Sequence, residues 1–320
     1  MLTPDFHQLQ SIDPGTLAAE ASTGLLAAHP WVSPKFFYDP LGSRLFDAIT
    51  ELDEYYPTRT EAAIMRAYLP DMAAAVQAHL GRGFSLYDLG AGDGAKAARL
   101  FELLAPGRYV ALDISVDYLR QSLDRLQREH PSIQMGGAGL DFSSRLALPA
   151  TLCEPRALVF YPGSSIGNFD PEDALRLLRD AHRLADGGAL LIGVDLLKDS
   201  AVLEAAYDDV LGVTAAFNLN LLRHLNRLIG SDFDARQWQH LARFDPPTSR
   251  VEMHLVARHA LAVSWRGGGR RFNAGESIHT ENAYKWTLPG FEALLRDAGW
   301  RGVRHWTDAQ QAFAVVLATA

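Results

Sequence analysis

From about Thr60 onward, short apolar runs alternate with segments whose apolar residues recur at helical spacing. Nearly continuous apolar runs indicate strands that are buried on both faces. Strands are predicted at 84–89, 108–114, 157–162, 189–196 and 312–318. Helices are predicted at 61–80, 95–104, 171–184 and 290–298. Buried strands separated by helices predict an α/β fold, in which a parallel sheet is covered on both faces.

Two segments depart from this alternation. The first 59 residues are helical and rich in aromatic residues, whereas 199–286 contain a helix at 217–229, a strand-like run at 250–263 and a further strand after a glycine turn. The later segment therefore resembles an insertion after the 189–196 strand. We expect two domains, one of 60–198 and 287–320, and a smaller α+β domain of 1–59 and 199–286.

Composition narrows the classes of function. The chain has 320 residues, of which 48% are hydrophobic and 21% charged, as in an ordinary soluble globular protein. Its formal net charge of −8 gives no general attraction to nucleic acid or to an anionic membrane. The stretch SWRGGGRR (264–271) is better interpreted as a glycine hairpin with solvated arginines than as an RNA-binding segment.

Cysteine and histidine usage argues against disulfides and metals. Cys153 is the single cysteine, which excludes an intrachain disulfide and fits a reducing cytoplasm. Neither His254 nor His259 has a partner at ligand spacing, so no metal site is predicted. The first 15 residues lack the pattern of a secretory signal, and no apolar run approaches the ~20 residues of a membrane helix. We expect a cytoplasmic protein without a membrane partner.

The stretch YDLGAGDGAKAARLF (87–101) predicts a loop that binds a nucleotide-like ligand. A phosphate-binding P-loop is disfavoured, because Lys96 lies between alanines and no Ser or Thr follows it. A dinucleotide site prefers G-x-G-x-x-G, whereas Gly90, Gly92 and Gly94 give G-x-G-x-G. The acidic Asp88 just before the loop is typical of enzymes that use S-adenosylmethionine, which has no phosphate.

Two further acidic positions strengthen the S-adenosylmethionine hypothesis. Asp113 ends the next predicted strand, where a carboxylate should accept hydrogen bonds from both ribose hydroxyls. Asp141 and Phe142, in the sequence GLDF, follow at a position suited to the adenine, with Asp141 accepting from its exocyclic amine. The competing interpretation is a glycine turn without a ligand, and it weakens once Asp113 and Asp141 are in place.

The acceptor of the methyl group is indicated by segments outside the loop. Base-modifying amino methyltransferases usually carry Asn/Asp-Pro-Pro-Tyr/Phe after the strand that corresponds to 157–162, but this chain has YPGSSIGNFD (161–170), so a nucleic-acid base is disfavoured. Other segments carry a specific resemblance over nearly the whole chain. They are PKFFYDPLGSRLFDAITELDEYYPTRTE (34–61), PGSSIGNF (162–169), VDLLKD (194–199), YDDVLGVTAAFNLNLLRHLN (207–226), RVEMHL (250–255) and HTENAYKW (279–286).

These segments resemble the L-histidine Nα-methyltransferases of ergothioneine biosynthesis. The resemblance implies a class I, Rossmann-like S-adenosylmethionine-dependent methyltransferase domain (60–198 and 287–320) and a substrate-binding or lid domain (1–59 and 199–286). It implies three successive transfers to the amino nitrogen of L-histidine, giving the trimethylated product hercynine. Both ligands are small molecules, S-adenosylhomocysteine is the second product, and a monomer suffices, because one chain supplies every matched position.

The resemblance also implies roles for individual residues. Tyr38 matches a tyrosine close to the reacting amino group, and Tyr55 matches one that closes over the cofactor. The remaining cofactor positions are Gly90, Lys96, Asp113, Asp141 and Phe142. The groups that hold the amino-acid end of the substrate are Gly163, Asn168 and Tyr207. Glu281 matches the carboxylate that accepts from the imidazole N–H, and Met253 lies beside that ring.

One position departs from the family pattern. The family usually has a serine two residues after the glutamate, where this chain has Ala283. Losing one neutral hydrogen bond costs ~0.5–1.5 kcal/mol. Weaker histidine affinity, a substituting water and a different amino acid such as tryptophan all remain open. So does a regulator that binds S-adenosylmethionine without catalysis, although the presence of Tyr38, Asn168, Tyr207 and Glu281 argues against it.

Overall fold

The computed structural model describes residues 2–9, 14–142 and 145–320, which form two compact units. The first, called the sheet unit here, comprises residues 2–9, Thr60–Leu196 and Trp286–Ala320. The second unit comprises residues 14–59 and Leu197–Lys285. Each unit has its own apolar core. In the described part of the chain, no helix combines the length and the apolar character needed to cross a bilayer.

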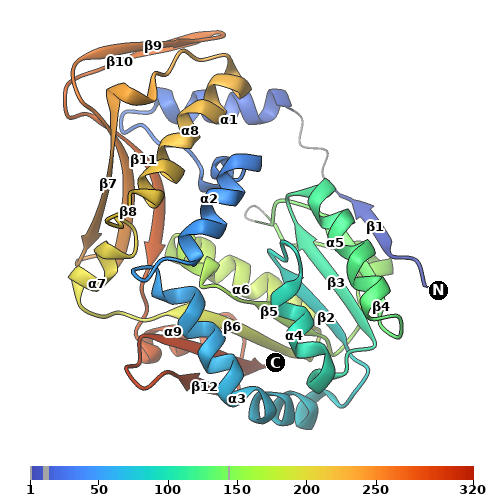
Figure 1. Cartoon of the computed structure of the whole chain (residues 1–320). Helices are drawn as coiled ribbons and strands as arrows, with labels where there is room; N and C mark the ends of the chain where they lie inside the picture. The colour runs from blue at the N-terminus through green and yellow to red at the C-terminus, as the bar shows by residue number, and fades with distance from the viewer. Residues whose placement is uncertain (1, 10–13, 143–144) are drawn as a thin grey trace. The chain divides into compact units, whose positions relative to one another are not determined.

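The sheet unit is built on one twisted sheet (Figure 1). Its strands are β1 (Asp5–Gln8), β2 (Ser85–Leu89), β3 (Arg108–Asp113), β4 (Gln134–Gly139), β5 (Leu158–Tyr161), β6 (Ala189–Asp195), β12 (Val303–Thr307) and β13 (Phe313–Thr319). Their order across the sheet is β1-β4-β3-β2-β5-β6-β13-β12. All neighbours from β1 to β6 pair in parallel, whereas β13 is antiparallel to both β6 and β12. The fold is therefore Rossmann-like, as the buried strands predicted.

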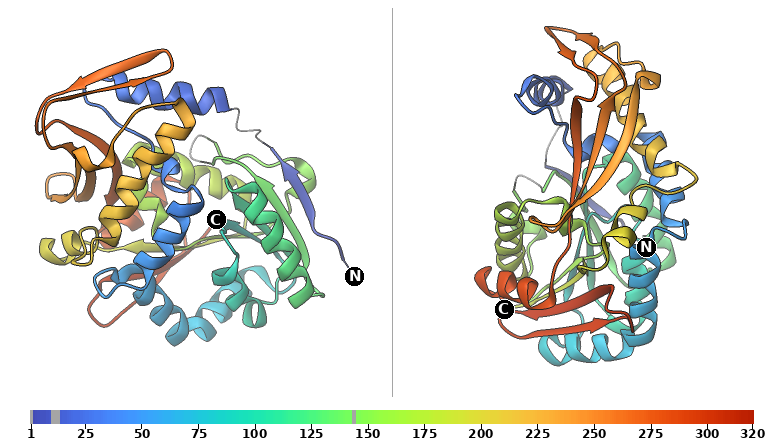
Figure 2. Two further views of the ribbon diagram at one scale, coloured as in Figure 1. Left: turned by 45° about the horizontal axis from the view of Figure 1, so that its top comes forward. Right: turned by 90° about the vertical axis from the view of Figure 1, so that its left-hand side faces the viewer.

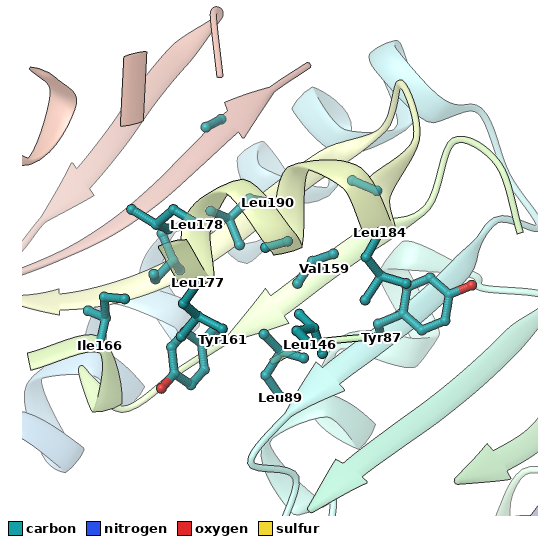
Figure 3. Packing of buried hydrophobic residues seen from close by; sticks show 14 of the residues in the cluster. Tyr87, Leu89, Leu146, Val159, Tyr161, Ile166, Leu177, Leu178, Leu184 and Leu190 are labelled. Carbon is teal, nitrogen blue, oxygen red and sulfur yellow. The ribbon is translucent and has the colours of Figure 1, made fainter. Parts of the chain in front are cut away.

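Helices cover both faces of this sheet. The helices and short 3-10 turns of the unit are α3 (Tyr56–Leu80), α4 (Ala95–Leu104), α5 (Val116–Glu129), η2 (Ala150–Leu152), η3 (Ser165–Asn168), α6 (Pro171–Ala185) and α9 (Leu288–Asp297). One core cluster joins α6 and α9 to the sheet, and another joins α3, α4 and α5 to it. In the first cluster, Leu177, Leu178 and Leu184 of α6 lie over strand residues such as Val159 and Leu190 (Figure 3).

The second unit combines helices with a three-stranded antiparallel sheet and a hairpin (Figures 1 and 2). Its strands are β7 (Trp238–Asp245), β8 (Arg250–Ala257), β9 (Leu261–Trp265), β10 (Gly268–Phe272) and β11 (Ser277–Tyr284), and its helices are α1 (Pro14–Leu26), η1 (Pro34–Phe37), α2 (Pro40–Thr50), α7 (Ser200–Ala205), α8 (Val213–Ile229) and η4 (Ala235–Gln237). The sheet has the order β11-β8-β7. α8 contributes Phe217, Leu221, Leu222 and Leu225 to a core shared with Met253 and Leu255 of β8.

Several elements differ from the sequence-based expectation. Residues 5–8, expected in the smaller domain, form β1 in the sheet unit, because β1 pairs in parallel with β4 and Phe6 packs on that core. β4 has the glycine-rich sequence QMGGAG and no apolar run. A Cβ at Gly137 would lie 2.4 Å from Leu123, and one at Gly139 would lie 2.5 Å from Val116. Close packing of α5 against β4 thus removes the apolar pattern by which a buried strand is predicted.

Two further differences are the direction of the last strands of the large sheet and a strand, β7, that the sequence did not predict. β12 and β13 form an antiparallel pair, so the sheet is mostly rather than wholly parallel. β7 was not predicted, because its polarity does not follow its burial: the buried position 240 is a histidine and the exposed position 241 is a leucine. The glycine hairpin expected at 264–271 is confirmed, but Arg270 is not solvated, since its side chain is 17% exposed and donates to the Leu25 and Ala27 carbonyls. β9 and β10 pair there in antiparallel fashion, and Gly267 adopts φ +84° in the turn.

Candidate active site

The glycine loop joins β2 to α4 with an unusual backbone. Gly90, Gly92 and Gly94 have φ values of +69°, +55° and +70°, in the left-handed region that glycine adopts without steric cost. Gly94 is constrained twice, because a Cβ there would also lie 2.6 Å from Leu126. At Gly92, by contrast, a Cβ would meet no described atom within 4 Å. The loop therefore brings bare backbone to an open space, as a ligand cradle requires.

Asp113 lies where the sequence predicted it, at the carboxyl end of β3 beside this loop. Its Oδ2 accepts a hydrogen bond from the Gly92 N–H at 2.9 Å, and its Oδ1 accepts from the Ser115 N–H at 2.8 Å. Each carboxylate oxygen has a second lone pair for a ligand hydroxyl. The two backbone contacts hold the carboxylate in one orientation, which suits recognition of a ribose diol.

Asp88 is a buried acid beneath the loop. It is 2% exposed, and its Oδ2 accepts from the Tyr109 hydroxyl at 2.8 Å. Burial raises the pKa of Asp88 to about 7, although the Tyr109 hydrogen bond and nearby Lys96 oppose that shift. Its Oδ1 makes no hydrogen bond to any described residue. A buried carboxylate with an unused oxygen fits a site whose ligand is cationic or carries N–H donors.

Lys96, on the first turn of α4, is bound to a residue that the site prediction omitted. Its Nζ lies 2.9 Å from Oε2 of Glu61, and Oε1 of Glu61 accepts the backbone N–H of Gly163 at 2.7 Å. Lys96 and Gly163 are thus brought together, as a Cβ at Gly163 would lie 3.2 Å from the Lys96 ammonium. A signal for Glu61 existed, because it is a charged residue three positions before the buried Ile64 on the apolar side of α3.

Phe142 and Asn168 follow two strands of the parallel part of the sheet, β4 and β5, which β3 and β2 separate. Phe142 follows β4, its ring packs edge-on against Tyr161 at 6.0 Å, and its Cζ lies 3.9 Å from where a Gly90 Cβ would stand. Asn168 ends η3, the short turn after β5. Asp141, partly buried, directly precedes Phe142. These residues follow the carboxyl ends of parallel strands, where ligands bind in open α/β sheets.

In the second unit, aromatic rings connect three of the predicted tyrosines. Phe46 lies 5.8 Å from the Tyr38 ring and 6.1 Å from the Tyr55 ring, in both cases edge to face. The Tyr55 ring in turn lies 6.2 Å from the Tyr207 ring. The Tyr207 hydroxyl accepts a hydrogen bond from Lys285 Nζ at 2.9 Å. Residues from three separate parts of the chain therefore form one aromatic cluster with a cation at its end.

Glu281 and Met253 are directly opposite each other on β11 and β8. A register shift between His279 and Glu281 precedes this pair, and the buried Thr280 donates its hydroxyl to the Met253 carbonyl at 3.0 Å. Burial raises the pKa of Glu281 to about 7, and nearby Lys285 opposes the shift. Ala283, two residues further along β11, lies on the same face as Glu281. It pairs with Val251 and is 3% exposed.

Comparison with known proteins decides the family. Residues 17–320 match the family model described as histidine-specific methyltransferase, SAM-dependent. This chain belongs to that family. Histidine N-alpha-methyltransferase from Mycolicibacterium smegmatis is 37% identical over 94% of both chains, and the enzyme of the same name from Mycobacterium tuberculosis is 37% identical over 96% of both. Ergothioneine biosynthesis protein 1 from Neurospora crassa is 30% identical over 84% of this chain and 31% of its own.

For a histidine-specific methyltransferase, the predicted positions divide between the units. The sheet unit holds Gly90, Lys96, Asp113, Asp141, Phe142, Gly163 and Asn168, and the second unit holds Tyr38, Tyr55, Tyr207, Met253, Glu281 and Ala283. The loop glycines, the held Asp113 carboxylate and the unused oxygen of Asp88 fit S-adenosylmethionine, on which this family depends. Among residues 2–9, 14–142 and 145–320, no three His, Cys, Asp or Glu side chains are grouped to hold a metal.

Proposed function

We propose that this chain transfers methyl groups from S-adenosylmethionine to the α-amino nitrogen of L-histidine, three times in succession, to give the trimethylated amino acid. Membership of the histidine-specific family supports the reaction class and cofactor. The observation that carries the substrate is the pair Glu281 and Met253, a carboxylate beside a thioether on one face of a sheet. This pair can recognise an imidazole through one N–H and its ring surface.

The sheet unit would bind the cofactor. Asp113 would accept hydrogen bonds from the ribose hydroxyls, and Asp141 and Phe142 would contact the adenine. Gly90 allows backbone approach, and the Lys96 ammonium would pair with the carboxylate of the ligand. Tyr55, in the second unit, would close over the cofactor. S-adenosylmethionine, when bound, supplies an electrophilic methyl group on a positively charged sulfur.

The remaining residues would bind and orient the amino acid. Asn168 and Tyr207 would hold its carboxylate with neutral donors, which add no full charge next to the sulfonium. Gly163, whose N–H is bound by Glu61, would line the same end of the amino acid without adding a side chain. The Tyr38 hydroxyl would accept a hydrogen bond from the amino group and direct its lone pair. Methyl transfer needs an unprotonated amine in line with the methyl carbon. Most of the rate gain would therefore come from such positioning. Ala283 leaves imidazole recognition to Glu281 and Met253.

The proposal includes an assignment of the two units and of the partners. The sheet unit would be the cofactor domain, and the second unit the substrate-binding domain. The chain would act as a cytoplasmic monomer without a nucleic-acid partner, consistent with its lone cysteine and net charge of −8. Light scattering coupled to size exclusion would test the monomer, and a dimer mass would contradict it.

A mass-spectrometric panel tests the substrate. Purified protein is incubated with S-adenosylmethionine and single amino acids, with L-histidine and L-tryptophan included. We expect a histidine product heavier by three methyl groups and no comparable product from the others. Turnover of tryptophan without turnover of histidine would overturn the substrate and keep the class. Cofactor binding without turnover of any amino acid would favour a regulator.

A further inference from the structure

A buried carboxylate links two residues to which the proposed function gives different ligands. Glu61 accepts from Lys96 Nζ at 2.9 Å through one oxygen and from the Gly163 N–H at 2.7 Å through the other. Its side chain is 4% exposed. We propose that Glu61 is a positioning residue that holds the cofactor-side Lys96 and the amino-acid-side Gly163 in register, an inference that rests on the proposed function.

The sheet leaves a dedicated place for this carboxylate. Gly193 lies in the middle of β6, where glycine weakens a strand because it has no side chain to pack. A Cβ at Gly193 would lie 2.1 Å from Oε1 of Glu61 and 3.1 Å from the Phe313 ring. The missing side chain of Gly193 is therefore a condition for the position of Glu61.

The ion pair is asymmetric in its exposure. The Lys96 side chain is 44% exposed, whereas Glu61 is almost wholly buried. An ammonium has three N–H donors on a flexible stem, and Glu61 takes one of them. The carboxylate thus holds the ammonium from its buried side. It also offsets the charge of Lys96 close to where a sulfonium would bind. The exposed side of Lys96 can then meet the carboxylate of the ligand.

The Gly163 end of the link fixes a strained turn. Gly163 has φ +82° and Ser164 has φ +58°, so two successive residues are left-handed. Glu61 binds the first N–H of this turn, and the Ser164 hydroxyl accepts the Asp195 N–H at 2.8 Å. The turn continues into η3, which ends at Asn168. Loss of Glu61 would release the start of the segment that carries Gly163 and Asn168.

Calorimetric binding of S-adenosylhomocysteine tests the cofactor side without needing turnover. We expect Glu61→Gln and Glu61→Ala to weaken binding by about tenfold or more, because Lys96 loses a charge-assisted partner. Asp180→Asn is the matched control. Asp180 is also a buried carboxylate that binds one backbone N–H, from Leu146, and one arginine, Arg183. Unchanged or tighter binding by Glu61→Gln, or an equal loss in Asp180→Asn, would overturn the proposal.

Histidine binding to the S-adenosylhomocysteine complex tests the other side. Glutamine retains an acceptor for the Gly163 N–H, so Glu61→Ala should weaken histidine several-fold more than Glu61→Gln, while their cofactor affinities stay similar. Equal histidine affinities of the two variants would overturn the coupling.

Gly193→Ala provides a second route if the Glu61 variants fold poorly. By displacing the Glu61 carboxylate, it should reproduce the cofactor defect in the native sequence. A folded Gly193→Ala protein with unchanged affinity for S-adenosylhomocysteine would contradict the link. If the native protein binds S-adenosylhomocysteine but methylates another amino acid, the proposed substrate fails, whereas the cofactor comparison still decides the role of Glu61.

Discussion

Glu281 on β11 faces Met253 on β8, one residue after a bulge at Thr280 whose hydroxyl binds the Met253 carbonyl at 3.0 Å. A bulge adds a residue to one strand and re-aims the side chains that follow it. The hydrogen bond from Thr280 therefore ties the position of Glu281 to the backbone of its partner strand. Imidazole recognition depends on this local distortion if Glu281 acts as proposed.

Replacing Thr280 tests that dependence. Thr280→Val keeps the shape but loses the hydroxyl, and we expect kcat/KM for histidine to fall by about three- to tenfold, the equivalent of one hydrogen bond. Thr280→Ser should retain most of the activity, because it keeps the donor. Affinity for S-adenosylhomocysteine should be equal in all three proteins. A similar loss in the serine variant would contradict the role of the hydrogen bond.

Variants of Glu281 and Asp113 should affect the binding of different ligands, histidine for Glu281 and the cofactor for Asp113. Glu281→Ala removes a charge-assisted hydrogen bond worth ~1.5–3 kcal/mol, so histidine KM should rise by roughly ten- to a hundredfold, with little change in cofactor affinity. Steady-state kinetics and calorimetry measure the two effects. Asn282→Ala is the control, since Asn282 is the next residue and binds His279 instead.

Asp113→Ala should show the opposite pattern. Loss of the held carboxylate should weaken S-adenosylhomocysteine by about tenfold or more, because two ribose hydroxyls lose their acceptor. Histidine affinity, measured at saturating cofactor, should change much less. Equal effects of the Asp113 and Glu281 variants on cofactor affinity would contradict the division of roles between these acids.

Ala283→Ser should improve histidine use. Ala283 lies on the same face as Glu281, and a hydroxyl there could add one neutral hydrogen bond of ~0.5–1.5 kcal/mol, or about two- to tenfold in kcat/KM. Because the position is 3% exposed, an unpartnered hydroxyl would instead be costly. A fall in histidine kcat/KM would show that the native site is already complete without it.

Asp88 should make stability depend on pH. Burial raises its folded-state pKa to about 7, from an ordinary value of 3.8. The folded protein then binds the proton more tightly, so the contribution of Asp88 to stability is present below about pH 4 and is lost as the pH rises toward 7. The free energy of unfolding of Asp88→Asn, minus that of the native sequence, should therefore increase between pH 4 and 7 and level off above. Urea unfolding at several pH values measures this, and a flat difference would contradict it.

Local sequence patterns were sufficient to predict much of the sheet unit. Strands such as β5 and β6 are nearly continuous apolar runs, and the glycines of the loop reflect left-handed backbone. Asp113 could be predicted because the end of a parallel strand next to that loop is a defined place. β4 could not, because its glycines make room for Leu123 and Val116 of α5.

The residues around the site divide in the same way. The amino-acid sequence alone identified the glycine loop, its acidic companions and the family to which Glu281 and Tyr38 point, because these signals are residue types at short or matched spacing. The bulge at Thr280, the ring contacts of Tyr55 with Tyr207, and the link from Glu61 to Lys96 and Gly163 emerged only in three dimensions. Each depends on groups that are distant in the chain and become neighbours through packing, so no local pattern of polarity encodes them.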